Sequence, residues 1–200
     1  MFLRKLQPED APLMLEWMHD DSVVHHLSTN FAAKTLMDCQ RFIAASQGSS
    51  ENWNLAIADD SGTYMGTVSL KHIDRTAQTA EFAITIRACA MGKGYSHYGM
   101  TEILRMGLEE LGLTAIYWCV SPENKRAVRF YDKHSYTRTT DIPQTIPFRL
   151  KGERVEIDVN LREHKHQRLY QRLQEEQNET DLPGENEHTT VHLLFASKVF

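Results

Sequence analysis

Three glycines and a lysine occupy residues 91–99, which read MGKGYSHYG between a strand-like run and an amphipathic helix. Gly92 and Gly94 can adopt backbone angles that side chains forbid. Successive amide N–H groups can therefore turn toward one anion at the start of the helix, where the helix dipole is positive. The chemistry that this segment favours is the binding of a pyrophosphate.

Two familiar phosphate-binding motifs fit this segment poorly. The dinucleotide fingerprint G-x-G-x-x-G needs its third glycine two residues before Gly99, and an acidic residue about 20 positions further on, where the chain reads TAIYWC. A P-loop needs a lysine directly before the hydroxyl residue, and here Met100 precedes Thr101. A glycine turn that only joins a strand to a helix is the third alternative.

A second motif, PENKRAVRFY at residues 122–131, closely follows the strand-like run 115–120. Asn124 is a good N-cap for a helix that runs to about Lys133. Asn124 and Tyr131 are seven residues apart, which corresponds to two helical turns, so both lie on one face of that helix. The two side chains can therefore point at one ligand.

In this order and separation, the two motifs resemble those of the GCN5-related N-acetyltransferase (GNAT) superfamily, nearest to its ribosomal-protein and amino-sugar acetyltransferase branches. The resemblance covers roughly residues 1–161 and implies acetyl-CoA as the cosubstrate. It implies that Asn124 contacts the pantetheine arm and that Tyr131 protonates the departing thiolate. The alternative for Tyr131 is a ring packed beside Val128. The backbone amides implied to hold the pyrophosphate are those of Met91, Gly92, Lys93, Gly94, Tyr95 and Ser96.

The strand-like run 80–86 carries the remaining candidates. By resemblance, the backbone N–H of Ile84 or of a neighbour such as Ile86 stabilises the oxygen that becomes negative. Strand alternation places Glu81 on the face opposite Phe82, Ile84 and Ile86. In many GNAT members an acid near this position helps to remove the amine proton, so Glu81 is the candidate base. The alternative is a solvated carboxylate at a strand end.

The chain departs from the family pattern in two places. The family usually has Gln or Arg three residues before the first glycine, where this chain has Cys89, with Arg87 two positions earlier. The tyrosine helix usually ends in Gly-Phe, where this chain has Ser135 and Tyr136. Ser135 is therefore expected to take the left-handed turn at some cost.

The hydrophobic pattern predicts the element order β-α-α-β-β-β-α-β-α-β-β, with tight turns joining three central strands. This order describes an α/β domain with a mixed, mostly antiparallel central sheet and flanking helices, in agreement with the GNAT fold that the resemblance implies. The expected strands are residues 2–6, 54–58, 64–71, 80–86, 115–120, 136–140 and 155–161, and the expected helices begin near residues 8, 35, 95 and 124.

Composition limits the domain organisation. Two hundred residues, 41% of them hydrophobic, suit one domain at residues 1–161, followed by a C-terminal extension at 162–200. The extension reads as a polar helix, a turn and an apolar strand. Because an exposed apolar strand promotes association, we expect it to pair with the sheet or with a second subunit in a homodimer.

Charge and the absence of targeting signals limit the partners. A net charge of −5 argues against nucleic acid and weakly favours a cationic amine. The sequence has no run of about 18 apolar residues and no signal segment, so we expect a cytoplasmic protein without a membrane partner. Cys39, Cys89 and Cys119 lack metal-ligand spacing, so we expect reduced residues in or near the core and no metal.

These observations predict an N-acetyltransferase that moves an acetyl group from acetyl-CoA to the primary amine of a small molecule, such as an amino sugar or a polyamine. Two alternatives stay open. One is transfer to a protein N-terminus, as in the ribosomal-protein type, and the other is a non-catalytic CoA-binding sensor or scaffold of the same fold. The walls of the acceptor site are expected from residues 17–28, the second helix and the loop 142–152.

Overall fold

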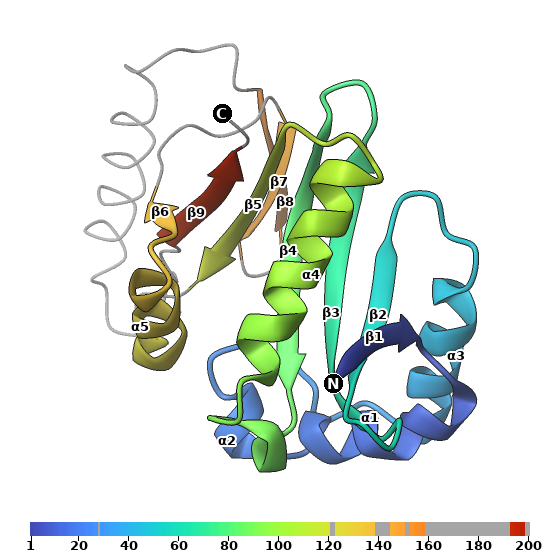
Figure 1. The fold of residues 1–200 in the computed structure, drawn as a ribbon. Coiled ribbons are helices and arrows are strands. Elements are labelled where there is room, and N and C mark those ends of the chain that lie inside the picture. The colour runs from blue at the N-terminus through green and yellow to red at the C-terminus, as the bar shows by residue number, and fades with distance from the viewer. Residues whose placement is uncertain (28, 121–122, 139–144, 151–152, 159–192, 199–200) are drawn as a thin grey trace, which may run out of the picture.

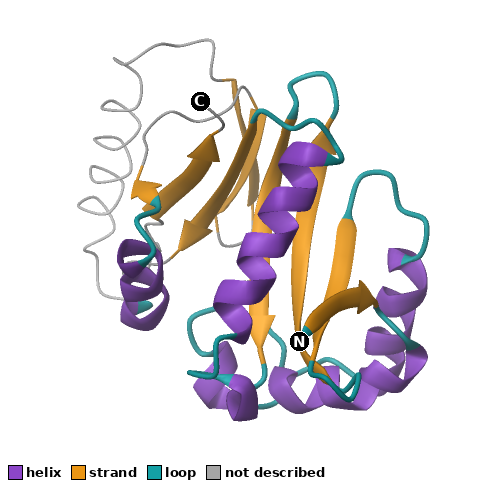
Figure 2. Cartoon of the chain, in the orientation of Figure 1, coloured by secondary structure: helices purple, strands orange, loops and turns teal. Residues whose placement is uncertain are grey.

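The computed structural model describes residues 1–27, 29–120, 123–138, 145–150, 153–158 and 193–198. In this part of the chain, helices flank a central sheet, and α4 crosses the front of that sheet (Figure 1; Figure 2). The strands are β1 (Phe2–Lys5), β2 (Trp53–Ala58), β3 (Tyr64–Asp74), β4 (Thr79–Ile86), β5 (Ala115–Val120), β6 (Thr137–Arg138), β7 (Thr145–Leu150), β8 (Glu153–Asp158) and β9 (Leu193–Lys198). The α-helices are α1 (Ala11–Met18), α2 (Asp21–Val24), α3 (Leu36–Ser46), α4 (Tyr95–Glu109) and α5 (Lys125–Lys133), and the 3₁₀ turns are η1 (Pro8–Asp10) and η2 (Ala88–Ala90).

The main sheet is mixed and mostly antiparallel, as the sequence predicts. Its strand order within the described residues is β1-β2-β3-β4-β5-β9-β6. Neighbours from β1 to β4 are antiparallel, β4 and β5 run parallel, and β9 is antiparallel to both β5 and β6. Because β4 and β5 are consecutive strands that run parallel, the chain must cross over between them, and α4 forms this crossover.

The parallel strands β4 and β5 pair only over their first halves. Their register joins Thr79 to Ala115, Ala80 to Ile116 and Glu81 to Tyr117, and within the described residues it extends no further. On its other side, β4 stays paired with β3 up to Ile86. The two strands therefore part after Glu81 and leave one edge of residues 82–86 without a strand partner.

The two faces of the sheet pack against different helices. Val68 and Leu70 of β3 belong to the larger core cluster, which includes Met100, Ile103 and Leu104 of α4. On the opposite face, α1 and α3 pack in a second cluster through Met14, Trp17, Cys39 and Ile43, with Ala56 of β2 beneath them. Alternation along the strands thus sends every second residue toward α4 and the others toward α1 and α3.

Glycines bring α4 very close to the sheet. A Cβ added at Gly99 would lie 2.4 Å from Cδ1 of Ile57, and one added at Gly107 would lie 2.7 Å from Cδ1 of Ile116. Gly99 belongs to the same glycine-rich segment as Gly92 and Gly94, but its role is to allow close packing of the helix on the sheet.

The structure adds elements that the sequence pattern did not predict. α2 is a short extra helix, and residues 145–150, expected in a loop, form β7 against β8. The described part of the predicted strand 155–161, residues 155–158, thus lies in a separate hairpin, and β9 takes the place beside β5 in the main sheet. The apolar run near residue 195 therefore pairs with the sheet, one of the two outcomes expected for it.

Two predictions about the C-terminal part of the chain stay untested. The polar helix expected after residue 162 lies outside the described residues, and the domain boundary at residue 161 stays a prediction. Among the described helices, none is both long and apolar enough to cross a bilayer.

A buried ion pair fixes the entry to α1. Asp10 is 3% exposed, and its carboxylate accepts hydrogen bonds from the Arg4 guanidinium at 2.7 and 2.8 Å and from the Gln7 amide at 2.8 Å. Removing one partner of a buried pair costs about 3–5 kcal/mol. We expect Asp10→Ala to lower the free energy of unfolding in urea by about 3 kcal/mol. Asp60→Ala removes an exposed carboxylate as the control, and an equal loss in both variants would contradict this role.

Candidate active site

The glycine segment forms an open loop at the start of α4. Gly92 and Gly94 have φ angles of +73° and +88°, in the left-handed region, and a Cβ at either would meet nothing within 4 Å. Gly94 is the N-cap of α4 and provides no side-chain cap. In the described structure, the amides of Gly92, Gly94, Tyr95 and Ser96 make no hydrogen bond. The loop thus presents unpaired donors at the positive end of a 15-residue helix, as an anion site requires.

The other two amides of the predicted set have local partners. The Met91 amide donates to the carbonyl of Ala88 at 3.2 Å, and the Lys93 amide donates to that of Ala90 at 3.4 Å. The set of amides that can face a pyrophosphate narrows to Gly92, Gly94, Tyr95 and Ser96. The exposed side chain of Lys93 adds a positive charge beside them.

The second motif lies directly against the first. Asn124 caps α5, as predicted, because its Oδ1 accepts a hydrogen bond from the Ala127 amide at 3.1 Å. One Arg126 nitrogen lies 2.8 Å from the Met91 sulfur, and another donates to the Ser22 carbonyl at 3.4 Å. The start of α5 therefore contacts the residue that precedes the glycine loop, although the two are 35 positions apart in the sequence.

Tyr131 is packed among aromatic rings. It is 7% exposed, and its ring centroid lies 5.4 Å from those of Trp118 and Phe130 and 6.3 Å from that of Tyr136. Burial, with a smaller contribution from Tyr136, raises the pKa of the Tyr131 phenol well above its ordinary value. A phenol in this state stays protonated at neutral pH, so it can give a proton but cannot act as a base.

Strand β4 brings the remaining candidates to the point where β4 and β5 part. Glu81 stands at the last paired position, and its carboxylate lies 3.7 Å from Nε2 of His72. Ile84 follows on the unpaired edge, where its backbone is open to a ligand. Ile86 ends the strand with its side chain buried in the core.

A pocket of about 250 Å³ lies on the sheet face opposite α4 and reaches β4 at residues 83–85. Its walls come from α1, α3 and the segment between them, with β3 and β4 as its floor. The expected wall at residues 17–28 contributes only its first two residues, and the described part of the 142–152 loop contributes none. The lining residues are Met14, Trp17, Met18, Phe31, Lys34, Asp38, Phe42, Thr67, Ser69, Lys71, Ala83, Ile84 and Thr85.

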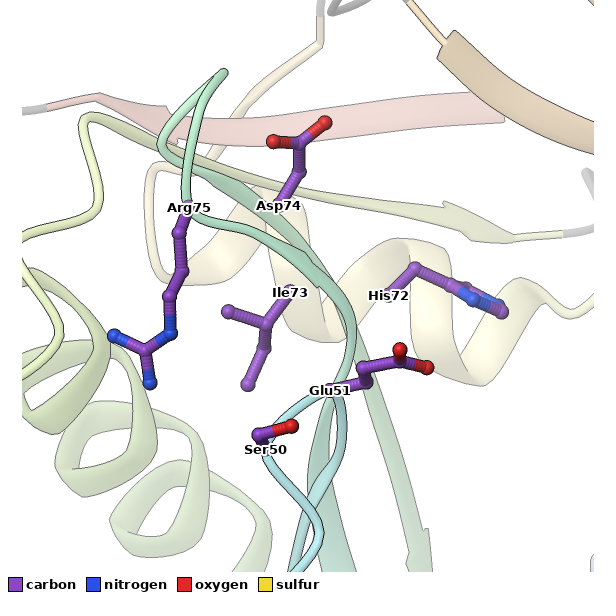
Figure 3. Close-up of a pocket in the computed structure, with 6 residues that line it drawn as sticks. All are labelled: Ser50, Glu51, His72, Ile73, Asp74 and Arg75. Atoms are coloured by element: carbon purple, nitrogen blue, oxygen red, sulfur yellow. The ribbon is translucent and has the colours of Figure 1, made fainter.

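A second hollow, of about 390 Å³, lies at the far end of β3 and is lined by Ser50, Glu51, His72, Ile73, Asp74 and Arg75 (Figure 3). Asp74 pairs with Thr79 at the start of β4, whereas the glycine loop follows the end of that strand. Asp74 already accepts hydrogen bonds from two backbone amides at 2.8 Å. This hollow is therefore at the opposite end of β4 from the glycine loop, although His72 in its lining lies 3.7 Å from the Glu81 carboxylate.

A family model for GNAT acetyltransferase domains matches residues 1–136. The chain belongs to the GNAT family. It is therefore an acetyl-CoA-dependent acyltransferase. No curated protein sequence matches this GNAT chain.

Solved structures share the GNAT fold of this chain at low sequence identity. A spermidine N-acetyltransferase from Vibrio cholerae in complex with CoA and spermine has a TM-score of 0.69 and 15% identity, covering 98% of this chain and 94% of that one. A putative ribosomal-protein-serine acetyltransferase from Vibrio cholerae has a TM-score of 0.64 and 14% identity over 98% and 92% of the chains. A GNAT acetyltransferase from Bacillus anthracis has a TM-score of 0.64 and 17% identity over 98% and 93%.

The two departures from the GNAT pattern have structural explanations. Arg87 does not reach the glycine loop, because its guanidinium donates to the Glu16 carboxylate at 2.8 to 3.1 Å and to the Tyr64 carbonyl at 3.0 Å. Ser135 has a φ of +59°, which confirms the predicted left-handed turn.

Cys89 is exposed, so the prediction that it lies in or near the core is wrong. It lies on the short turn η2, where its side chain faces outward.

The first turn of α4 touches the end of α5 through two stacked imidazoles. The rings of His97 and His134 are 4.0 Å apart and nearly parallel, at 11°. Burial, followed by the positive charge that His97 gains, lowers the pKa of His134 below its ordinary value.

This stack predicts a loss of stability in mild acid. Because the folded state binds the His134 proton less tightly than the unfolded state, the free energy of unfolding falls as the pH drops below about 6.5. We expect the melting temperature to fall between pH 7.5 and 5.5, and His134→Gln to make that slope shallower. His26, whose pKa is also lowered by burial, contributes to the slope in both proteins. An unchanged slope in the variant would remove the stack as a cause.

Proposed function

We propose that this GNAT enzyme moves an acetyl group from acetyl-CoA to the primary amine of a small molecule. Amino sugars and polyamines are the types that the sequence favours, and a protein N-terminus is the alternative. The main support for the proposal is that the unpaired edge of β4 and the pocket involve the same residues of that strand. The parted strands open one edge of residues 82–86, and the pocket on the opposite face from α4 reaches residues 83–85.

The glycine loop fits the cosubstrate. Bound acetyl-CoA supplies the thioester, whose acetyl group the acceptor takes. The unpaired amides of Gly92, Gly94, Tyr95 and Ser96 would hold its pyrophosphate at the amino end of α4. The Asn124 side-chain oxygen is occupied by its capping bond, so the NH₂ group of Asn124 would donate to a carbonyl of the pantetheine arm.

The reaction requires three further roles, which we assign to β4 and α5. The backbone N–H of Ile84, or of Ile86 on the same strand, would donate to the carbonyl oxygen as it becomes negative. Glu81 would take the amine proton, directly or through water, from its place where β4 and β5 part. Tyr131 would give its phenolic proton to the departing sulfur. A tyrosine phenol is protonated at neutral pH even with its ordinary pKa of about 10, so Tyr131 carries its proton at the start of each cycle.

Thiol release from acetyl-CoA tests this proposal. Purified protein is incubated with acetyl-CoA and a panel that includes glucosamine, spermidine, single amino acids and short peptides with free N-termini. The expected result is amine-dependent release with at least one small molecule. Release with peptides alone would favour the N-terminal alternative, and saturable CoA binding without release would favour a sensor or scaffold.

The cellular setting follows as a further part of the proposal. Cys39 and Cys89 are free cysteines, which fits the reducing conditions of the cytoplasm. We place the enzyme there, acting without a metal. A homodimer is the assembly to test by light scattering.

A further inference from the structure

We propose that the acceptor carries an acidic group beside its amine and an apolar body, as an apolar amino acid does, and that Lys34 and Lys71 select it. This inference rests on the proposed function and narrows its substrate class. It comes from the pocket of about 250 Å³, whose otherwise mostly apolar lining includes these two lysines.

Within the described residues, neither Lys34 nor Lys71 of the lining is held in a salt bridge, although the charge of Lys34 acts on Asp38 from a distance. Glu81 stands opposite Lys71 in the strand register, but its carboxylate lies 3.7 Å from His72 and is not part of the lining. An anionic group on the ligand would therefore give these ammonium groups a salt-bridge partner.

The carboxylate in the lining is already engaged. Oδ2 of Asp38 accepts hydrogen bonds from the amide of Thr35 at 2.9 Å and from its hydroxyl at 2.7 Å, which closes a capping box at the start of α3. Its other oxygen lies 3.8 Å from Arg41. These contacts lower the pKa of Asp38, mainly through the Thr35 hydroxyl, so it stays ionised as a helix cap. The lining thus carries two positively charged lysines and one carboxylate, which is already hydrogen-bonded to Thr35. Because a polyamine is itself a polycation, this balance of charge disfavours it as the acceptor.

Most of the other polar atoms in the pocket are also satisfied. The indole N–H of Trp17 donates to the Tyr64 hydroxyl at 3.0 Å, and that hydroxyl shares a hydrogen bond of 2.7 Å with Thr67. Ser69 donates to Asn54 at 2.7 Å. The surface that would contact the acceptor is then largely apolar. It includes the methionines of α1 and the rings of Trp17 and Phe31, whose centroids lie 5.2 Å apart in an edge-to-face arrangement. Such a lining favours an apolar body.

Pocket size and the place of Lys71 set the shape of the acceptor. About 250 Å³ lies below the range of roughly 300–1,000 Å³ that is typical for drug-sized ligands, so one amino acid fits better than an oligosaccharide. Lys71 and Ser69 lie on β3 opposite Glu81 and Ala83, next to the residues that would hold the thioester. A flexible lysine stem can therefore reach an acidic group that is close to the reacting amine.

Matched acceptors test the inference. L-Phenylalanine and L-phenylalaninamide share the amine and the ring, and only the first has a carboxylate; spermidine represents the polycations. We expect kcat/KM for phenylalanine to exceed that for its amide by about 10- to 100-fold, as one charge-assisted contact provides. In Lys71→Met and Lys34→Met this ratio should fall toward one. Lys71→Arg should retain it, and Lys5→Met, an exposed lysine outside the pocket, should leave it unchanged.

A binding measurement separates this inference from the proposed function. Saturation-transfer NMR with the CoA-bound protein should show phenylalanine bound more tightly than its amide, and the Kd of CoA should be the same in all five proteins. Equal or better use of the amide or spermidine by the unaltered enzyme, or an unchanged ratio in both methionine variants, would overturn the inference while leaving acetyl transfer in place. Absence of thiol release with every amine would instead overturn the proposed function.

Discussion

Replacing Tyr131 with phenylalanine is expected to lower kcat by about tens to hundreds of times with little change in fold. The variant keeps the ring that packs against Trp118 and removes only the hydroxyl. Because a thiolate is already a fair leaving group, with a thiol pKa of about 8.5, the lost acid accounts for part of the rate and not all of it. Stopped-flow or steady-state thiol release measures the change.

Tyr136→Phe is the matched control for this prediction. Tyr136 also packs its ring on Trp118, at 5.2 Å, and burial raises its pKa as well, but it follows α5 and has no assigned role. The two variants lose the same atom from the same aromatic cluster. Full turnover by Tyr131→Phe, or an equal loss in both variants, would remove Tyr131 as the acid.

Gly94→Val is expected to weaken CoA binding by about 100-fold. A β-branched residue at φ +88° strains the backbone by about 1–2 kcal/mol, and its side chain enters the open space that the ligand would fill. The strain lowers the stability of the fold, whereas the loss of charge-assisted amide contacts lowers the binding free energy by about 1.5–3 kcal/mol, and each 1.4 kcal/mol corresponds to a factor of ten in Kd. Isothermal titration with CoA measures the difference.

Gly62→Val serves as the control because Gly62 has the same geometry elsewhere. Its φ is +87° and a Cβ there also meets nothing within 4 Å, but it lies in the turn between β2 and β3. Both variants should lose similar stability, and only Gly94→Val should lose CoA. Unchanged CoA affinity in Gly94→Val would contradict the assignment of the pyrophosphate to this loop.

Features encoded by neighbouring residues could be predicted from the sequence. The left-handed glycines, the Asn124 cap and the turn at Ser135 each depend on a few consecutive residues, and the structure has all three. The first five strands were predicted for the same reason, since alternation is a local pattern. Their sheet then follows from tight turns and one helical crossover.

Features that depend on distant pairs could not be predicted in the same way. Arg87 binds Glu16, which is 71 positions away, and no spacing rule connects them. The strand next to β5 is β9, whereas the nearer segment at residues 153–158 pairs locally with β7. The floor of the proposed acceptor pocket was missed for a different reason, although Trp17 and the second predicted helix were expected among its walls. Thr67, Ser69 and Lys71 alternate visibly along β3, and this polar row was the signal that could have located its floor.

The parting of β4 from β5 also places an open strand edge in the interior of the sheet. An unpaired strand edge is ordinarily a template for intermolecular pairing. Here the open edge of residues 82–86 lies inside a continuous sheet, between β3 on one side and the diverging β5 on the other. A narrow ligand that carries amide groups can hydrogen-bond to the open edge of β4. A whole strand of another chain is wider, and β5 stands in its way. We therefore expect this gap to admit a small molecule more readily than a strand of another chain.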